Sequence, residues 1–163
     1  MALTKMQELY TWGSAMLTGL DDKENRHIPT VMEFFKNHKI AQVCCGGLHT
    51  MVLTKKGTLY AWGSAEGGQL GIPDLTCESI ATPRQLESLT NQNVIQVSCG
   101  EAHTVALAED GKVWGWGMSM YGQLGLGFSG DSFEPGVGML YSRVNEPTEI
   151  TPFLPPNIKI AQI

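Results

Sequence analysis

The sequence is short of charge, and its few basic residues gather nowhere along the chain. Lys and Arg number 11 in 163 residues against 16 Asp and Glu, which gives a formal net charge of −5. The longest basic run is the pair Lys55-Lys56. Proteins that hold nucleic acid through phosphate contacts carry a basic stripe or patch. The composition therefore gives no strong nucleic-acid signal and argues against a DNA-binding surface.

Long apolar segments and a disulfide framework are also missing. No apolar run approaches the roughly 20 residues of a membrane span, and the N-terminal segment lacks the apolar core of a secretory signal. The four cysteines stand at positions 44, 45, 77 and 99. Two adjacent cysteines are a poor start for a disulfide framework. We therefore expect free thiols, no membrane association, and an intracellular location in the cytoplasm or nucleus.

What the sequence does contain is a repeat. Residues 42–72 align without gaps on residues 96–126, which lie 54 positions later, and 14 of the 31 positions are identical. The motif Ile-Ala-Gln-Val at 40–43 returns in similar form at 94–97 and 160–163. We therefore predict a single repeat domain over 1–163. Its units are about 1–39 (partial), 40–93 and 94–159, residues 160–163 start another unit, and a loop insertion covers 127–146.

Each unit has the pattern of short β-strands separated by turns. An apolar inner strand is followed by a β-branched segment, "HTMVLT" or "HTVALA", and then by a turn, "KKG" or "EDG". Gly57 and Gly111 supply the positive φ that such hairpin turns need. A further alternating segment and an extended stretch around Pro83 or Pro147 complete the unit. Four short strands per roughly 50 residues are typical of a β-propeller blade.

Two segments look partly helical and need a place in this scheme. Residues 30–39 and 84–92 could each form a turn or more of helix, and they occupy matching positions in successive units. We interpret both as outer-strand or connector segments.

The repeated motif is Cys-Gly-x-x-His-Thr with a Gly eight positions after the His, and then Trp-Gly and Gly-Gln-Leu-Gly. It resembles the RCC1 (regulator of chromosome condensation) repeat family over nearly the whole chain. The resemblance implies an all-β fold, a β-propeller of RCC1 type, usually of seven blades, that acts as a protein-interaction platform. It also implies a function seen in part of the family, guanine-nucleotide exchange on the small GTPase Ran. Other members carry such repeats in ubiquitin ligases, ciliary proteins and photoreceptors.

The chain has two full units and two partial ones, about three blades, whereas propellers typically close with 4–8. We therefore expect a partial or truncated propeller that belongs to a longer one, or one that is closed by self-assembly or by further repeats. The basic N-terminal tail of nuclear family members is absent, which weakens chromatin binding.

Residues that recur in both full units are expected to be structural. We predict that His49 and His103 hydrogen-bond to backbone within their own blades, and that Trp12, Trp62 and Trp116 pack between blades. The structural repeat positions are Cys45, Gly46, His49, Thr50, Gly57, Trp62 and Gly63 in the first copy, and Cys99, Gly100, His103, Thr104, Gly111, Trp116 and Gly117 in the second.

Chemical sites are weaker hypotheses. The spacing Cys-x-x-x-His, as in Cys45–His49, could be half of a metal site, but no second ligand pair lies near it in sequence. The cysteines at 44, 45 and 99 fall at or beside repeat positions, which favours packing over nucleophilic chemistry. No Ser/His/Asp set or paired acids are evident. We therefore predict no bond-making enzyme, no metal and no cofactor.

Binding residues should lie where the copies differ, because loops on a rigid scaffold carry function. We predict a protein partner, with a small GTPase as one option. The function we favour is a protein-interaction scaffold that binds through blade-connecting loops. The alternatives are a guanine-nucleotide exchange factor for a Ran-type GTPase and a regulatory segment of a larger enzyme such as a ubiquitin ligase. The candidate partner-binding residues are Asp74, Phe128, Asp131, Phe133, Glu134, Tyr141 and Arg143.

Overall fold

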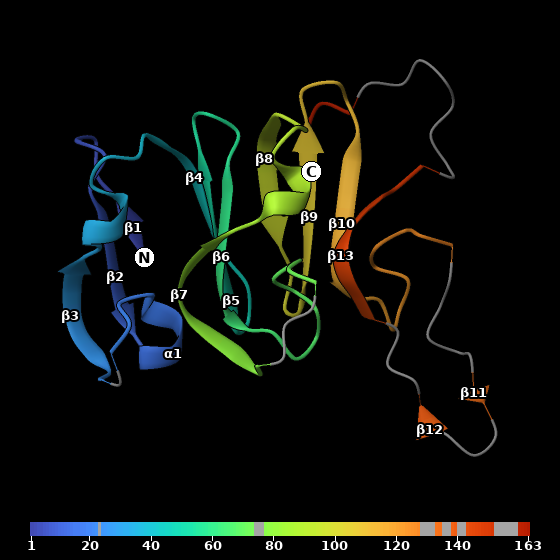
Figure 1. The fold of residues 1–163 in the computed structure, drawn as a ribbon, viewed down its shortest axis with the longest axis horizontal. Helices are drawn as coiled ribbons and strands as arrows, with labels where there is room; N and C mark the ends of the chain where they lie inside the picture. Colours follow the sequence, from blue (N-terminus) through green and yellow to red (C-terminus); the bar gives the residue numbers. More distant parts are fainter. Residues whose placement is uncertain (23, 74–76, 128–132, 135–137, 140–142, 152–159) are drawn as a thin grey trace.

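The described part of the chain forms three antiparallel sheets of three or four strands that stand side by side, and a separate two-stranded sheet (Figure 1). The computed structural model describes residues 1–22, 24–73, 77–127, 133–134, 138–139, 143–151 and 160–163. The first sheet contains β1 (Ala2–Leu3), β2 (Leu9–Gly13) and β3 (Arg26–Val31). The second contains β4 (Ile40–Cys45), β5 (His49–Thr54), β6 (Leu59–Ser64) and β7 (Ser79–Gln85). The third contains β8 (Val94–Cys99), β9 (His103–Ala108), β10 (Val113–Met118) and β13 (Arg143–Glu149).

The connections are short elements outside these sheets. They are α1 (Ala15–Thr18), the 3-10 turns η1 (Glu33–Phe35) and η2 (Glu87–Leu89), and the hairpin of β11 (Phe133–Glu134) with β12 (Gly138–Met139). The two segments that looked partly helical are each the end of an outer strand followed by one 3-10 turn, as interpreted from the sequence. Strand β13 begins at Arg143, so the last residues of the expected insertion 127–146 form strand.

The second and third sheets are copies of one meander, with strand orders β4-β5-β6-β7 and β8-β9-β10-β13. Their first three strands begin and end at positions exactly matched by the 54-residue repeat, because the same alternation and the same Gly-containing turns recur. These four-stranded antiparallel sheets confirm the predicted all-β fold with propeller-type blades.

The core lies between the sheets rather than within one of them. Successive side chains of a strand point to opposite faces. On β5, Met51 and Leu53 therefore pack toward the third sheet, while Val52 packs toward the first. All six residues of β5 are buried as a result. We call the two apolar layers the first seam, between the first and second sheets, and the second seam, between the second and third.

A tryptophan closes each seam against the backbone of a connecting segment in the preceding repeat unit. Trp62 Nε1 donates a hydrogen bond to the Leu17 carbonyl at 3.0 Å, and Trp116 Nε1 donates to the Gln69 carbonyl at 2.9 Å. Both tryptophans are fully buried, which confirms the predicted packing between blades. Trp12 differs, since 43% of its surface is exposed and no described residues form a sheet on that side of β2.

Glutamine side chains add a second link at the inner strands. Gln42 on β4 binds both backbone groups of Val97 on β8: its Nε2 donates to the carbonyl at 2.7 Å, and its Oε1 accepts from the amide at 3.0 Å. Gln96 binds the backbone of Ile163 in the same way, at 2.9 and 3.3 Å. Each glutamine therefore fixes the next inner segment in register without a direct strand pairing.

Candidate protein-binding face

Four turn segments of the second and third sheets gather on one side of the molecule. We call this side the loop face; it is formed by the turns 46–48 and 100–102 and by the segments 65–72 and 119–127. It lies at the bottom of Figure 1, where α1 is also found, and the hairpin turns 55–58 and 109–112 lie at the opposite end. The Gly47 amide donates to the Glu101 carbonyl at 2.9 Å, so the two inner turns are joined across the second seam.

A pocket of about 650 Å³ opens on the loop face over the second seam. Its apolar side chains include two of the most exposed large hydrophobic residues of the described chain, Leu48 at 54% and Tyr121 at 88%. Exposed apolar side chains around a hollow are typical of a surface that binds a partner. The lining residues are Gly47, Leu48, Gln69, Glu101, Ala102, His103, Met118, Met120, Tyr121 and Gln123.

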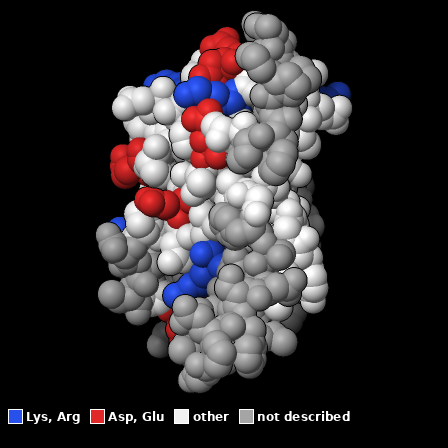
Figure 2. Space-filling view, turned by 90° about the vertical axis from the view of Figure 1, so that its right-hand side faces the viewer, with Lys and Arg blue, Asp and Glu red and all other residues white. Residues whose placement is uncertain are grey.

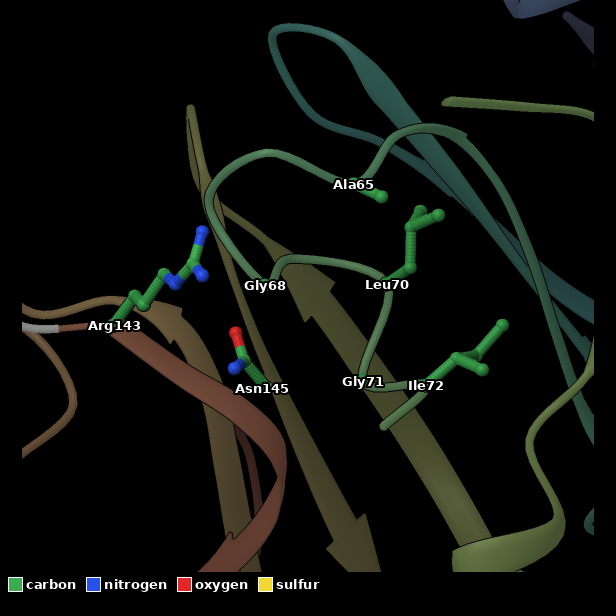
Figure 3. A pocket seen from close by; sticks show the side chains of 7 residues that line it. All are labelled: Ala65, Gly68, Leu70, Gly71, Ile72, Arg143 and Asn145. Carbon is green, nitrogen blue, oxygen red and sulfur yellow. The ribbon is translucent and has the colours of Figure 1, made fainter. Parts of the chain in front are cut away.

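A smaller cleft of about 210 Å³ lies between the segment 65–72 and the outer strand β13 (Figure 3). Arg143 and Asn145 extend from β13 toward this segment. The Arg143 guanidinium donates to the Glu66 carbonyl at 2.8 Å. This contact joins the second and third sheets on the loop face while the arginine side chain stays exposed to solvent.

Beneath the loop face, a polar chain crosses the second seam. Thr104 Oγ1 and Trp116 Nε1 both donate to the Gln69 carbonyl, and His49 Nε2 lies 2.9 Å from Thr104 Oγ1. Because the threonine hydrogen is used on the carbonyl, its oxygen accepts from His49, which assigns the proton to Nε2. The predicted bond from His49 to backbone within its own blade is therefore wrong, since the histidine binds a side chain of the next sheet.

Burial governs the charge of this histidine. His49 is only 1% exposed, and its Nδ1 has no hydrogen-bond partner among the described residues. Burial, with a smaller contribution from His103, lowers the pKa of His49 from 6.5 to about 4. Burial also lowers the pKa of His103. His49 is therefore neutral at physiological pH and serves as a structural donor rather than as a titrating catalytic group.

The predicted partner-binding residues fall in several places. Asp74, Phe128, Asp131 and Tyr141 lie outside the described residues. Phe133 and Glu134 form β11, of which the structure describes the backbone only. Arg143 is described, and it joins two sheets at the edge of the loop face. Whether these residues bind a partner stays a prediction.

The pocket residues Leu48, Met120 and Tyr121 are not among the binding residues predicted from the sequence. A signal was available, because each differs from its counterpart 54 positions away, namely Ala102, Glu66 and Gly67. These substitutions replace small or charged residues with large apolar ones on a surface turn. A search for large apolar residues in turns, at positions where the two copies differ, would therefore have indicated these three residues.

Within the described ranges, no group of three or more His, Cys, Asp or Glu side chains is placed to hold a metal ion. The Cys45–His49 half-site therefore gains no further ligands from that part of the chain. None of the described helices is long and apolar enough to cross a membrane. On the side shown in Figure 2, Lys and Arg form separate groups with Asp and Glu among them, and no continuous basic stripe is visible.

Comparison with known proteins agrees with this architecture. The "Regulator of chromosome condensation (RCC1) repeat" matches residues 8–53, 56–107 and 110–163. The Ultraviolet-B receptor UVR8 of Arabidopsis thaliana is 38% identical over 136 residues, which are 82% of this chain and 30% of the receptor. The human probable E3 ubiquitin-protein ligase HERC4 is 40% identical over 138 residues, 83% of this chain and 13% of the ligase.

Solved structures show the same fold. Prp20p from Saccharomyces cerevisiae superposes with a TM-score of 0.77 at 23% identity, over 93% of this chain and 36% of that one. Human WBSCR16 superposes with a TM-score of 0.70 at 27% identity, over 92% of this chain and 35% of that one. The chain thus spans about a third or less of the length of these similar proteins. The repeats, the four-stranded sheets and these similarities together place the chain in the RCC1 repeat family.

Proposed function

We propose that this chain is a protein-interaction scaffold and that its docking surface is the loop face. The observation that carries the proposal is the 650 Å³ pocket over the second seam, with the exposed Leu48 and Tyr121 at its rim. Apolar side chains beside a rigid, preformed hollow bind at little conformational cost. The predicted intracellular location and a protein partner are part of the same proposal.

The burial of repeated residues and the exposure of variable ones support this proposal. The residues shared by the copies, such as His49 and Trp116, are buried and hydrogen-bonded between sheets. They are unavailable to a partner. The pocket residues Leu48 and Tyr121 differ between the copies and are exposed, and they lie on turns that backbone hydrogen bonds hold in place.

Site-specific photocrosslinking in cells tests the proposal. A photoreactive amino acid at Tyr121 should capture a discrete protein partner, which mass spectrometry identifies. The same group at Lys56, exposed in a turn at the opposite end of the sheets, should not capture it. Leu48→Ser should remove the Tyr121 crosslink. Equal capture from both positions, or capture that survives Leu48→Ser, would contradict a docking role for the pocket.

Nucleotide exchange on a Ran-type GTPase is the second candidate. Its support is the fold shared with Prp20p, a protein described in a structural study of its binding to Gsp1p and histones. At 23% identity this likeness extends to the fold alone, so the activity needs its own assay. Release of fluorescent GDP from a Ran-type GTPase should accelerate at micromolar concentrations of this chain, and an unchanged release rate removes the candidate.

A regulatory role beside a catalytic domain is the third candidate. It is supported by the 40% identity to HERC4, of which the matching region is only 13%. Determining the coding sequence on either side of this region tests the candidate directly. A ligase domain in the same reading frame would favour this role, and its absence would leave the free-standing scaffold.

A further inference from the structure

Two thiols meet across the second seam, beneath the turns of the loop face. Cys44 lies near the end of β4, and Cys99 is the last residue of β8. The backbone amide of Cys99 donates a hydrogen bond to Cys44 Sγ at 2.9 Å. Both cysteines are partly buried and free, whereas Cys45 and Cys77 are exposed. The packing predicted for Cys45 is therefore not observed, and Cys44 and Cys99 form the inter-sheet pair.

The hydrogen bonds distinguish the two sulfur atoms. The Cys99 thiol and the Cys99 backbone amide, both beside Cys44 Sγ, lower the pKa of Cys44 from 9.0 to about 7 against the opposing effect of burial. The same thiol contact and burial raise the pKa of Cys99. A backbone amide can only donate, so the assignment of Cys44 as the acceptor follows from the geometry of the main chain. Of the two sulfurs, Cys44 is therefore the one whose thiolate form the Cys99 amide stabilises.

The repeat itself does not account for this pair. Cys44 corresponds to Ser98 in the next copy, so the architecture of the sheet accepts a hydroxyl at this position. Cys99 corresponds to Cys45, which is exposed and outside the seam. The meeting of two thiols is thus particular to the second seam.

We propose that Cys44 and Cys99 are a peroxide-reactive thiol pair that forms a disulfide between the second and third sheets. The Cys44 thiolate attacks a hydroperoxide, breaks its O–O bond and becomes a sulfenic acid, and the leaving oxygen takes up a proton to give water or an alcohol. The Cys99 thiol then attacks the sulfenic sulfur and a second molecule, water, leaves. Two thiols are oxidised, and one hydroperoxide is reduced.

The geometry favours the second step over further oxidation. Cys44 Sγ already contacts the backbone of Cys99, so we expect rotation of the two side chains to bring the sulfurs to the bond length of about 2.05 Å. The disulfide would lie directly before the turns 46–48 and 100–102, which line the pocket. Oxidation would therefore add a covalent link to the Gly47–Glu101 hydrogen bond and fix the spacing of these turns. This inference does not depend on the identity of a partner.

The test is oxidation of the dilute chain, residues 1–163, by hydrogen peroxide. Thiol titration under denaturing conditions should show that two of the four thiols are lost, and the intact mass should gain no oxygen. Tryptic digestion should join the peptide 40–55 to the peptide 85–112. Retention of all four thiols, or accumulation of oxygen adducts without the cross-link, would overturn the proposal.

Matched variants identify the residues. Cys44→Ser introduces the residue that the repeat carries at Ser98, and it should abolish the internal cross-link while the fold persists. Cys45→Ser should leave the cross-link intact. A cross-link that persists in Cys44→Ser, or that disappears in Cys45→Ser, contradicts the assignment. The oxidation rate of the wild type should rise with pH around 7; a rate that begins to rise only above about pH 8 would contradict Cys44 as the thiolate.

Discussion

The two seams of this molecule make the same tryptophan contact from different sequences. At the first seam, Trp62 meets the end of helix α1, where the sequence is Ala-Met-Leu-Thr-Gly. At the second seam, Trp116 meets the turn Gly-Gly-Gln-Leu-Gly. The acceptor is a main-chain carbonyl in both, and the ring lies against a glycine, Gly19 or Gly71. The contact therefore depends on backbone shape and on a missing side chain rather than on the identity of Leu17 or Gln69.

The seams differ in what surrounds that contact. The first is lined by Met32, Phe35 and other apolar side chains. The second adds polar groups: the His49–Thr104 bond, the two bonds of Gln42, and the Cys44–Cys99 pair. Nonpolar packing is tolerant of change, whereas buried polar groups must remain paired. The packing at the second seam should therefore depend more strongly on pH and on oxidation than the packing at the first seam.

The largest effect should come from removing a seam tryptophan. Trp116→Ala deletes a fully buried ring and its hydrogen bond to the Gln69 carbonyl. We expect the free energy of unfolding in urea to fall by about 3–5 kcal/mol. Trp12→Ala, at a position that is 43% exposed, should cost less than about 1 kcal/mol. Equal losses of unfolding free energy in the two variants would contradict the view that Trp116 stabilises a seam and Trp12 does not.

Acid should weaken the second seam through His49. Its folded pKa of about 4 lies below the ordinary 6.5, so the unfolded chain binds more protons between these values. Stability from this group is present above pH 6.5 and is lost as the pH falls toward 4, by up to about 3 kcal/mol. His49→Gln should flatten the fall of unfolding free energy over this range relative to the wild type. Parallel pH curves for the two proteins would contradict a buried, neutral His49.

A smaller effect is expected from the glutamine link. Gln42→Leu keeps the size of the side chain but leaves the Val97 amide and carbonyl without their partner. We expect a loss of about 1–3 kcal/mol and faster hydrogen exchange at the Val97 amide. Gln96→Leu removes the equivalent link to Ile163 and should leave the exchange of Val97 nearly unchanged. Equal acceleration at Val97 in both variants would argue against a local link.

Much of the fold could be predicted because each full repeat unit carries the same turn glycines and the same strand alternation, so that each unit supports the assignment of the other. The matching bounds of β4, β5 and β6 with β8, β9 and β10 follow from shared turns and alternation. The partner of His49 could not be predicted, because Thr104 lies 55 residues away and approaches only when two sheets pack. The residues Leu48 and Tyr121 could be found by comparing the copies, but the pocket itself could not be predicted, because the two residues belong to different sheets and line it together only when these sheets pack.

Close approach of the backbone to a tryptophan ring holds neighbouring sheets together, and one pair of glycines tests this. Gly71 and Gly125 are repeat counterparts with positive φ of 68° and 63°. A Cβ at Gly71 would lie 2.8 Å from Trp116 Nε1, whereas at Gly125 the nearest atom, Ile150 Cγ2, is 3.6 Å away.

Alanine at either glycine adds the same left-handed backbone strain, about 1–2 kcal/mol, but only Gly71→Ala also forces the ring from its place. The measurement is the free energy of unfolding of the two variants under the same conditions. This close approach predicts that Gly71→Ala is the less stable variant by a further ~1–3 kcal/mol. Equal stability of Gly71→Ala and Gly125→Ala would contradict it.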